Sequence, residues 1–108
     1  MTDSREFIFK KSPQGILRFV GDFDGYYRTE ADPWGQSGTE ESMEAYYRKS
    51  RARTLALLET TNTSELLIIG CGIGYTMTNY RGNRPTKIVG IDLSREAVKK
   101  AKKSFPEF

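Results

Sequence analysis

Three glycines follow an apolar run near the middle of this 108-residue chain. Residues 66–74 read L-L-I-I-G-C-G-I-G, so that Gly70, Gly72 and Gly74 stand two positions apart. Glycine tolerates positive φ angles and lets a ligand approach the free backbone N–H groups at the start of a helix. Asp92 follows the next apolar run, where a carboxylate can accept hydrogen bonds from both hydroxyls of a ribose. These residues predict a site for an adenosine-containing cofactor.

The spacing of these glycines differs from that of dinucleotide-binding loops. Such loops read G-x-G-x-x-G, and the last glycine of that pattern would fall at Tyr75. The third glycine comes one residue early, so the loop suits an uncharged or zwitterionic group better than a pyrophosphate. A fragment of an NAD(P)-binding Rossmann oxidoreductase, which would share the fold and Asp92, is the alternative enzyme class.

Residues 61–108 have the periodicity of two strands and two helices that could position this site. Residues 66–69 form an unbroken apolar run, typical of a strand buried on both faces. Residues 76–80 fit a short helix, residues 87–91 fit a second strand, and Ser94 can cap a last helix. The apolar stripe of that helix comprises Ala97, Val98, Ala101 and Phe105. This order predicts parallel pairing through a right-handed crossover, and therefore the first βαβα unit of an α/β cofactor-binding domain.

Residues 1–38 predict a β-hairpin followed by an aromatic loop. Apolar and polar residues alternate on both sides of the Ser-Pro-Gln-Gly turn at 12–15. Glycines and a proline interrupt any period between positions 22 and 38, which favours a loop. The side chains expected to order it are Tyr26, Tyr27 and Trp34.

Residues 39–60 predict a helix that caps the cofactor-binding unit. The hydroxyl of Thr39 or Ser42 can accept hydrogen bonds from its first N–H groups, and the helix should end near Glu59. Tyr47 and Arg51 stand one turn apart on the same face, so both could point at one ligand.

The glycine loop and the acid that follows it resemble motifs of the class I methyltransferases that use S-adenosylmethionine. The first family motif reads acid-x-G-x-G-x-G and the second ends in an acidic residue, similar to I-I-G-C-G-I-G and V-G-I-D here. The resemblance covers residues 65–105 and implies a Rossmann-like parallel sheet. Ile68 stands where the family usually has the acid that anchors the amino end of the cofactor.

The resemblance also implies roles for individual residues. The methionine and ribose part of the cofactor would lie against Gly70, Cys71, Gly72 and Gly74, with Asp92 holding the ribose and Leu93 beside the adenine. D-P-W-G at 32–35 and the helix that follows resemble the N-terminal cap of nodulation-type N-methyltransferases. In such caps a tryptophan packs over the cofactor and an arginine meets its carboxylate, which would be Trp34 and Arg51 here.

Each of these residues also has a structural interpretation. Trp34 would be a packing residue, Arg51 a solvated helix charge, Cys71 a small filler in a tight loop, and Asp92 a polar residue at a helix start. A non-catalytic interaction module derived from a methyltransferase, with the aromatic segment as its docking surface, is therefore a further alternative.

The implied function is methyl transfer from S-adenosylmethionine to a small-molecule acceptor. These motifs identify no catalytic residue and no metal site, and the chain contains no histidine that could act as a base. The family sheet has seven strands and this chain offers two, so we expect the βαβα unit to belong to a longer domain. Cofactor binding by these residues is accordingly a stronger prediction than catalysis by them alone.

Composition limits the remaining classes. A net charge of +3, much of it from outward lysines in residues 95–103 that we expect to be solvated, does not indicate a nucleic-acid partner. No apolar run approaches the roughly 18 residues of a membrane span, and the single cysteine favours a reducing, cytoplasmic compartment. The sequence does not indicate an oligomeric state.

Overall fold

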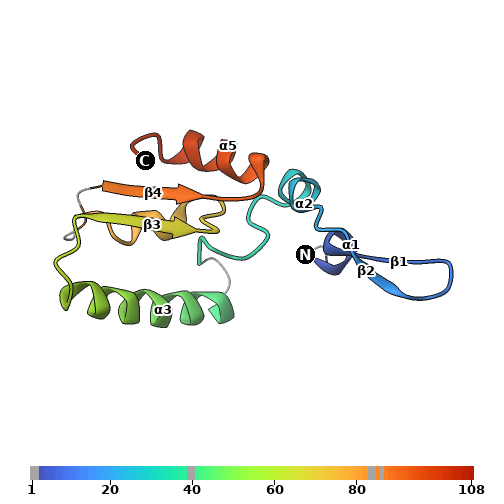
Figure 1. Ribbon diagram of the computed structural model, residues 1–108, viewed down its shortest axis with the longest axis horizontal. Helices are drawn as coiled ribbons and strands as arrows, with labels where there is room; N and C mark the ends of the chain where they lie inside the picture. The colour runs from blue at the N-terminus through green and yellow to red at the C-terminus, as the bar shows by residue number, and fades with distance from the viewer. Residues whose placement is uncertain (1–2, 39–40, 83–84, 86) are drawn as a thin grey trace.

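The computed structural model describes residues 3–38, 41–82, 85 and 87–108 of the chain. It is a mixed α/β structure in which β3 (Glu65–Ile69) and β4 (Lys87–Ile91) form a two-stranded parallel sheet. Helix α4 (Tyr75–Thr78) connects the strands, and α5 (Arg95–Ser104) follows β4 (Figure 1). The strand register runs from Glu65 opposite Lys87 to Ile69 opposite Ile91. The predicted α/β class is confirmed, as are the element order and the parallel pairing within residues 61–108.

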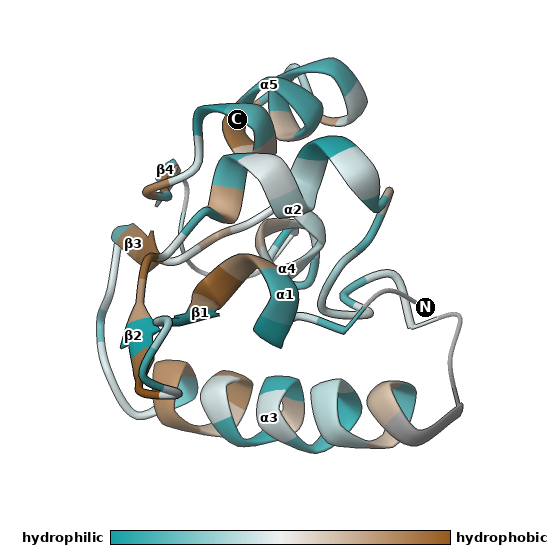
Figure 2. Cartoon of the chain, turned by 90° about the vertical axis from the view of Figure 1, so that its right-hand side faces the viewer, coloured by the Kyte–Doolittle hydropathy of each residue, from teal (hydrophilic) through white to brown (hydrophobic). Residues whose placement is uncertain are grey.

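The two strands are covered on one face only in the part of the chain that the structure describes. Along each strand, exposed residues alternate with partly buried ones, and Leu67 and Ile69 are 56% and 79% exposed. The prediction of a strand buried on both faces is therefore wrong. Figure 2 shows the brown apolar colour of β3 and β4, with α3 running along the bottom of the view. The unbroken apolar run therefore contains one set of residues that is partly buried, on the side where α4 contacts β4, and another set that faces outward.

Helix α5 forms as its sequence predicts. The Ser94 side chain accepts a hydrogen bond from the N–H of Ala97 at 3.1 Å, and Ala97 and Ala101 are buried. The expectation that its lysines are solvated is wrong for Lys100. The Lys100 ammonium donates to the carbonyls of Tyr27 and Glu30, the latter at 2.8 Å, and so fixes the end of a neighbouring helix.

That neighbour is α2 (Phe23–Thr29), which lies where the sequence predicted a loop. The Asp22 side chain caps the helix by accepting from the N–H of Gly25 at 2.9 Å. A Cβ on Gly25 would stand 2.3 Å from the Asp22 carboxylate, so this glycine permits the cap. Tyr26 and Tyr27 are buried, and their packing outweighs the low helix propensity of glycine.

The N-terminal hairpin is present but shorter than predicted. β1 (Phe9–Lys11) and β2 (Leu17–Phe19) pair antiparallel around a turn in which Gly15 has a φ of +81°. The preceding segment, α1 (Arg5–Ile8), is helical where the alternation predicted a strand. The Asp3 carboxylate accepts from the N–H of Arg5 at 2.9 Å just before that helix, a local hydrogen bond that favours a turn over a strand.

The predicted cap helix is α3 (Glu41–Glu59), while Thr39, one of its two candidate caps, lies outside the described residues. The helix runs along the sheet in Figure 1. Hydrogen bonds from Tyr47 to the carbonyl of Trp34 and from Arg51 to Asn79, both 2.9 Å long, tie it to the rest of the molecule. Across the described residues, none of the helices has the length and apolarity to cross a bilayer.

Candidate functional site

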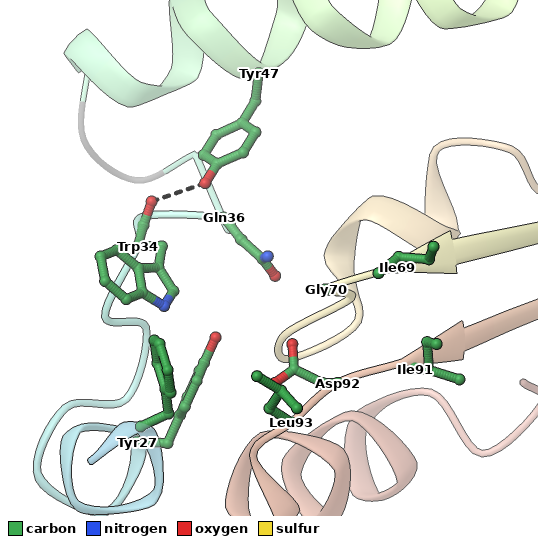
Figure 3. Close-up of a pocket in the computed structure, with 10 residues that line it drawn as sticks. Tyr27, Trp34, Gln36, Tyr47, Ile69, Gly70, Ile91, Asp92 and Leu93 are labelled. Atoms are coloured by element: carbon green, nitrogen blue, oxygen red, sulfur yellow. Dashed lines mark hydrogen bonds between the residues drawn. The ribbon is translucent and has the colours of Figure 1, made fainter. Parts of the chain in front are cut away.

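A cavity of about 560 Å³ opens at the carboxyl ends of β3 and β4, opposite α2 and the segment that joins α2 to α3 (Figure 3). Its volume lies in the range of small-molecule sites, about 300–1,000 Å³. The residues that line it are Phe23, Tyr27, Trp34, Gln36, Tyr47, Ile69, Gly70, Ile91, Asp92 and Leu93. Four of these are predicted cofactor residues, namely Trp34, Gly70, Asp92 and Leu93. The crevice beyond the strand ends is where open α/β sheets generally bind ligands.

The glycine loop passes beneath this cavity, open at Gly70 and closely covered at Gly72. Gly70 is exposed, with a φ of +74° and open space where a Cβ would stand. Gly72 has a φ of +54°, and a Cβ there would lie 2.7 Å from the amide nitrogen of Gln36 and 2.9 Å from the Tyr27 hydroxyl. Both positions therefore require glycine, the first for its conformation and the second also for space.

The N–H groups of the loop are already hydrogen-bonded within the protein. Gly70 and Cys71 donate to the carbonyl of Ile91 at 2.8 and 3.0 Å, and Gly74 donates to the carbonyl of Cys71 at 3.1 Å. Gly72 donates to a carboxylate oxygen of Asp92 at 2.8 Å. The expectation of free N–H groups facing a ligand is thus wrong for these four residues. Bonding to the second strand continues past the strand ends at Gly70 and Cys71, whereas Gly72 bonds to a side chain and Gly74 to a carbonyl within the loop. The loop offers close approach to a ligand rather than donors.

Asp92 joins the loop to the start of α5. Its second oxygen accepts from the N–H of Ser94 at 2.8 Å, so each carboxylate oxygen holds one backbone group. A carboxylate has about four acceptor sites, which leaves capacity for hydroxyl groups of a ligand in the cavity. The structural and the binding interpretations of Asp92 are therefore compatible.

Two predicted cofactor residues have packing roles in the structure. Cys71 is buried beneath β4, where a Cβ on Gly90 would stand 2.8 Å from the Cβ of Cys71. Burial, with the nearby Asp92 charge, raises the pKa of the Cys71 thiol. A Cβ on Gly74 would lie 2.9 Å from the Phe105 ring, so this glycine lets α5 approach the loop. Neither Cys71 nor Gly74 lines the cavity.

Aromatic residues form the wall opposite the strand ends. Trp34 packs against a buried cluster that includes Tyr27, and Tyr47 donates to the Trp34 carbonyl at 2.9 Å. Burial, together with the Asp92 charge, raises the pKa of the Tyr27 hydroxyl, and burial with the charge of Asp32 raises that of Tyr47. Both hydroxyls are therefore protonated at neutral pH, and the single donor of Tyr47 is already used by the Trp34 carbonyl. Trp34 therefore packs against the buried cluster and also lines the cavity, so its packing and binding interpretations are compatible.

The Asp32 carboxylate shapes the segment that carries Trp34. One oxygen accepts from the N–H of Gln36 at 2.8 Å, and the other accepts from the N–H and hydroxyl of Ser37. This ring of hydrogen bonds directs Trp34 and Gln36 toward the glycine loop (Figure 3). Sequence analysis overlooked Gln36, because a single glutamine in a loop carries no periodic or motif signal.

Arg51 lies in a second, more polar cavity of about 280 Å³ between α3 and α4. Its guanidinium donates to the side-chain oxygen of Asn79 at 2.9 Å. Gln36 and Tyr47 line both cavities, so they form the partition between them. Arg51 is thus neither fully solvated nor in the first cavity.

No protein-family model, curated protein or solved structure matches the chain. Within the described residues, no three His, Cys, Asp or Glu side chains gather in a way that could hold a metal ion. The functional assignment therefore depends on the motif residues and on the geometry of the two cavities.

Proposed function

We propose that the protein binds S-adenosylmethionine across the two cavities and serves as the cofactor-binding portion of a methyltransferase that acts on a small-molecule acceptor. One observation carries the proposal. The glycine loop and Asp92 border an apolar aromatic cavity, and that cavity adjoins a polar one containing Arg51. An adenosine joined to an amino acid has the same sequence of apolar, hydroxylated and charged parts. We further infer that β3, α4, β4 and α5 belong to a Rossmann-like sheet.

The chemistry of the lining residues fits this ligand. Tyr27 and Trp34 offer flat apolar surface to a purine, and Asp92 offers acceptors to ribose hydroxyls. The Arg51 guanidinium can bind a carboxylate through paired N–H donors. Aromatic faces also attract a cation such as a sulfonium.

The cofactor itself supplies an activated methyl group when bound. The protein must then align an acceptor with that methyl group and exclude water, since proximity lowers the barrier without acid–base chemistry. Leu93, 89% exposed at the rim of the cavity, would shield the adenine side. With its one cysteine buried and unoxidised, we propose the cytoplasm as the setting.

Titration calorimetry of the chain with S-adenosylhomocysteine and, separately, with NADH tests the proposal. We expect saturable heat with S-adenosylhomocysteine and none with NADH. Trp34 is the only tryptophan and lines the cavity, so its fluorescence should change over the same concentration range. Tighter binding of NADH would favour the nicotinamide alternative. Binding of neither ligand would contradict the proposal and favour the interaction module.

A further inference from the structure

The side chain of Gln36 holds a buried oxygen that accepts no hydrogen bond from any described residue. Its carboxamide lies directly over the glycine loop, within 2.9 Å of where a Cβ of Gly72 would stand. Its backbone is fixed by the bond from its N–H to Asp32. A buried amide oxygen without a donor is unfavourable, so a ligand that brings a donor to this place would bind more tightly.

The location of Gln36 indicates which part of a ligand would meet it. Gln36 lies at the partition between the two cavities, with Asp92 on one side and Arg51 on the other. A ligand whose ribose contacts Asp92 and whose carboxylate contacts Arg51 must pass the carboxamide. In S-adenosylmethionine the group beside the carboxylate is an ammonium, which carries three N–H donors.

The sequence around the glycine loop leaves this ammonium without its usual acceptor. Ile68 occupies the position at which the resembled family has an acid. The carboxylate among the residues that line the polar cavity is Glu44, whose side chain is 51% exposed and lies 3.9 Å from the Arg48 guanidinium. An exposed, paired carboxylate gains less from a new ion pair than a buried, unpaired oxygen gains from a new hydrogen bond.

We propose that the side-chain oxygen of Gln36 accepts a hydrogen bond from the α-ammonium of the cofactor and replaces the acid absent at Ile68. This inference rests on the proposed function and names the residue that recognises the amino end of the ligand. Gln36 is then a binding residue that separates S-adenosyl amino acids from adenosine derivatives lacking an amino group.

Calorimetry with two ligands and two variants of the full chain tests this inference. The ligands are S-adenosylhomocysteine and its desamino analogue, which keeps the carboxylate and lacks the ammonium. Gln36→Met retains the length of the side chain and removes the amide, while Glu44→Gln is the matched control. Gln36→Met should lower the affinity for S-adenosylhomocysteine about 10- to 100-fold and change the affinity for the desamino analogue less than about twofold. Glu44→Gln should leave both affinities within about twofold of the wild-type values.

The outcomes separate this inference from the function on which it rests. An equal loss of affinity for both ligands in Gln36→Met would overturn the inference, because Gln36 would then act through the shape of the cavity. Unchanged affinity in Gln36→Met, or a selective loss in Glu44→Gln, would also overturn it, although the proposed function would stand. Failure of the wild-type chain to bind S-adenosylhomocysteine would instead overturn the proposed function and the inference together.

Discussion

Replacing Asp92 by asparagine tests the connection between the glycine loop and the second strand. The carboxylate accepts from the N–H groups of Gly72 and Ser94, both at 2.8 Å. An asparagine side chain has one oxygen and one NH₂ group. However the amide turns, one backbone N–H loses its acceptor and faces another donor, while the other N–H keeps a neutral acceptor in place of a charged one.

The expected magnitude follows from these two bonds. A hydrogen bond to a charged acceptor contributes about 1.5–3 kcal/mol, and the residue is only partly buried, so water can replace some of the lost contact. We expect Asp92→Asn to lower the free energy of unfolding by about 2 kcal/mol, near the lower end of the range for the one bond that is lost. For a chain of this length the melting temperature should fall by roughly 10 °C.

Urea unfolding followed by far-ultraviolet circular dichroism measures this change. Glu59→Gln is the matched control, because it removes one negative charge from an exposed position at the end of α3. That variant should stay within about 0.5 kcal/mol of the wild type. If Asp92→Asn and Glu59→Gln unfold at the same urea concentration as the wild type, the two hydrogen bonds do not hold the loop and our account of the site geometry is refuted.

The same variant separates the structural role of Asp92 from its binding role. Loss of one acceptor for the ribose hydroxyls should lower the affinity for S-adenosylhomocysteine about tenfold. Calorimetry well below the unfolding temperature measures this change. A variant that loses stability and keeps full affinity would show that the ribose does not contact this carboxylate.

Three further predictions concern the packing around the site. Gly74→Ala should lower the free energy of unfolding by about 3 kcal/mol for two reasons. A residue with a side chain is strained at this left-handed φ, and its Cβ would also clash with the Phe105 ring. Gly82→Ala, with a similar φ and open space, should lose only about 1 kcal/mol, and equal losses in urea titrations would argue against the clash. The hydroxyl of Ser94 donates to Asp24 and lowers the pKa of that carboxyl below its ordinary 3.8. The stabilisation that this hydrogen bond gives the folded state is fully present above pH 3.8 and is lost as the pH falls through the lower, folded-state pKa. The stability gap between wild type and Asp24→Asn should therefore narrow in urea titrations below pH 3.8, and a constant gap would speak against this bond. Burial raises the pKa of Cys71, so iodoacetamide should label it slowly in the folded chain and quickly in urea, whereas fast labelling of the folded chain would show an exposed thiolate.

The sequence by itself determined the local elements of the βαβα unit. A branched apolar run, a serine cap and an alanine stripe each act within a few residues, so β3, β4 and α5 could be located from them. The need for glycine at positions 70 and 72 could also be predicted, because their conformation is a local property. The helix α2 could not be predicted in this way, because its stability depends on the burial of Tyr26 and Tyr27 by other segments.

Only the tertiary structure decided how the site is assembled. The N–H groups of Gly70, Cys71 and Gly72 are satisfied by Ile91 and Asp92, about 20 residues away, and this depends on a strand register that no local pattern specifies. The partition formed by Gln36 and Tyr47 comes from segments that lie far from the glycine loop in the sequence. The positions of these two residues depend on their hydrogen bonds to Asp32 and Trp34. Contacts between distant segments are fixed by packing of the whole chain, whereas caps and periodicity are fixed by neighbours along it.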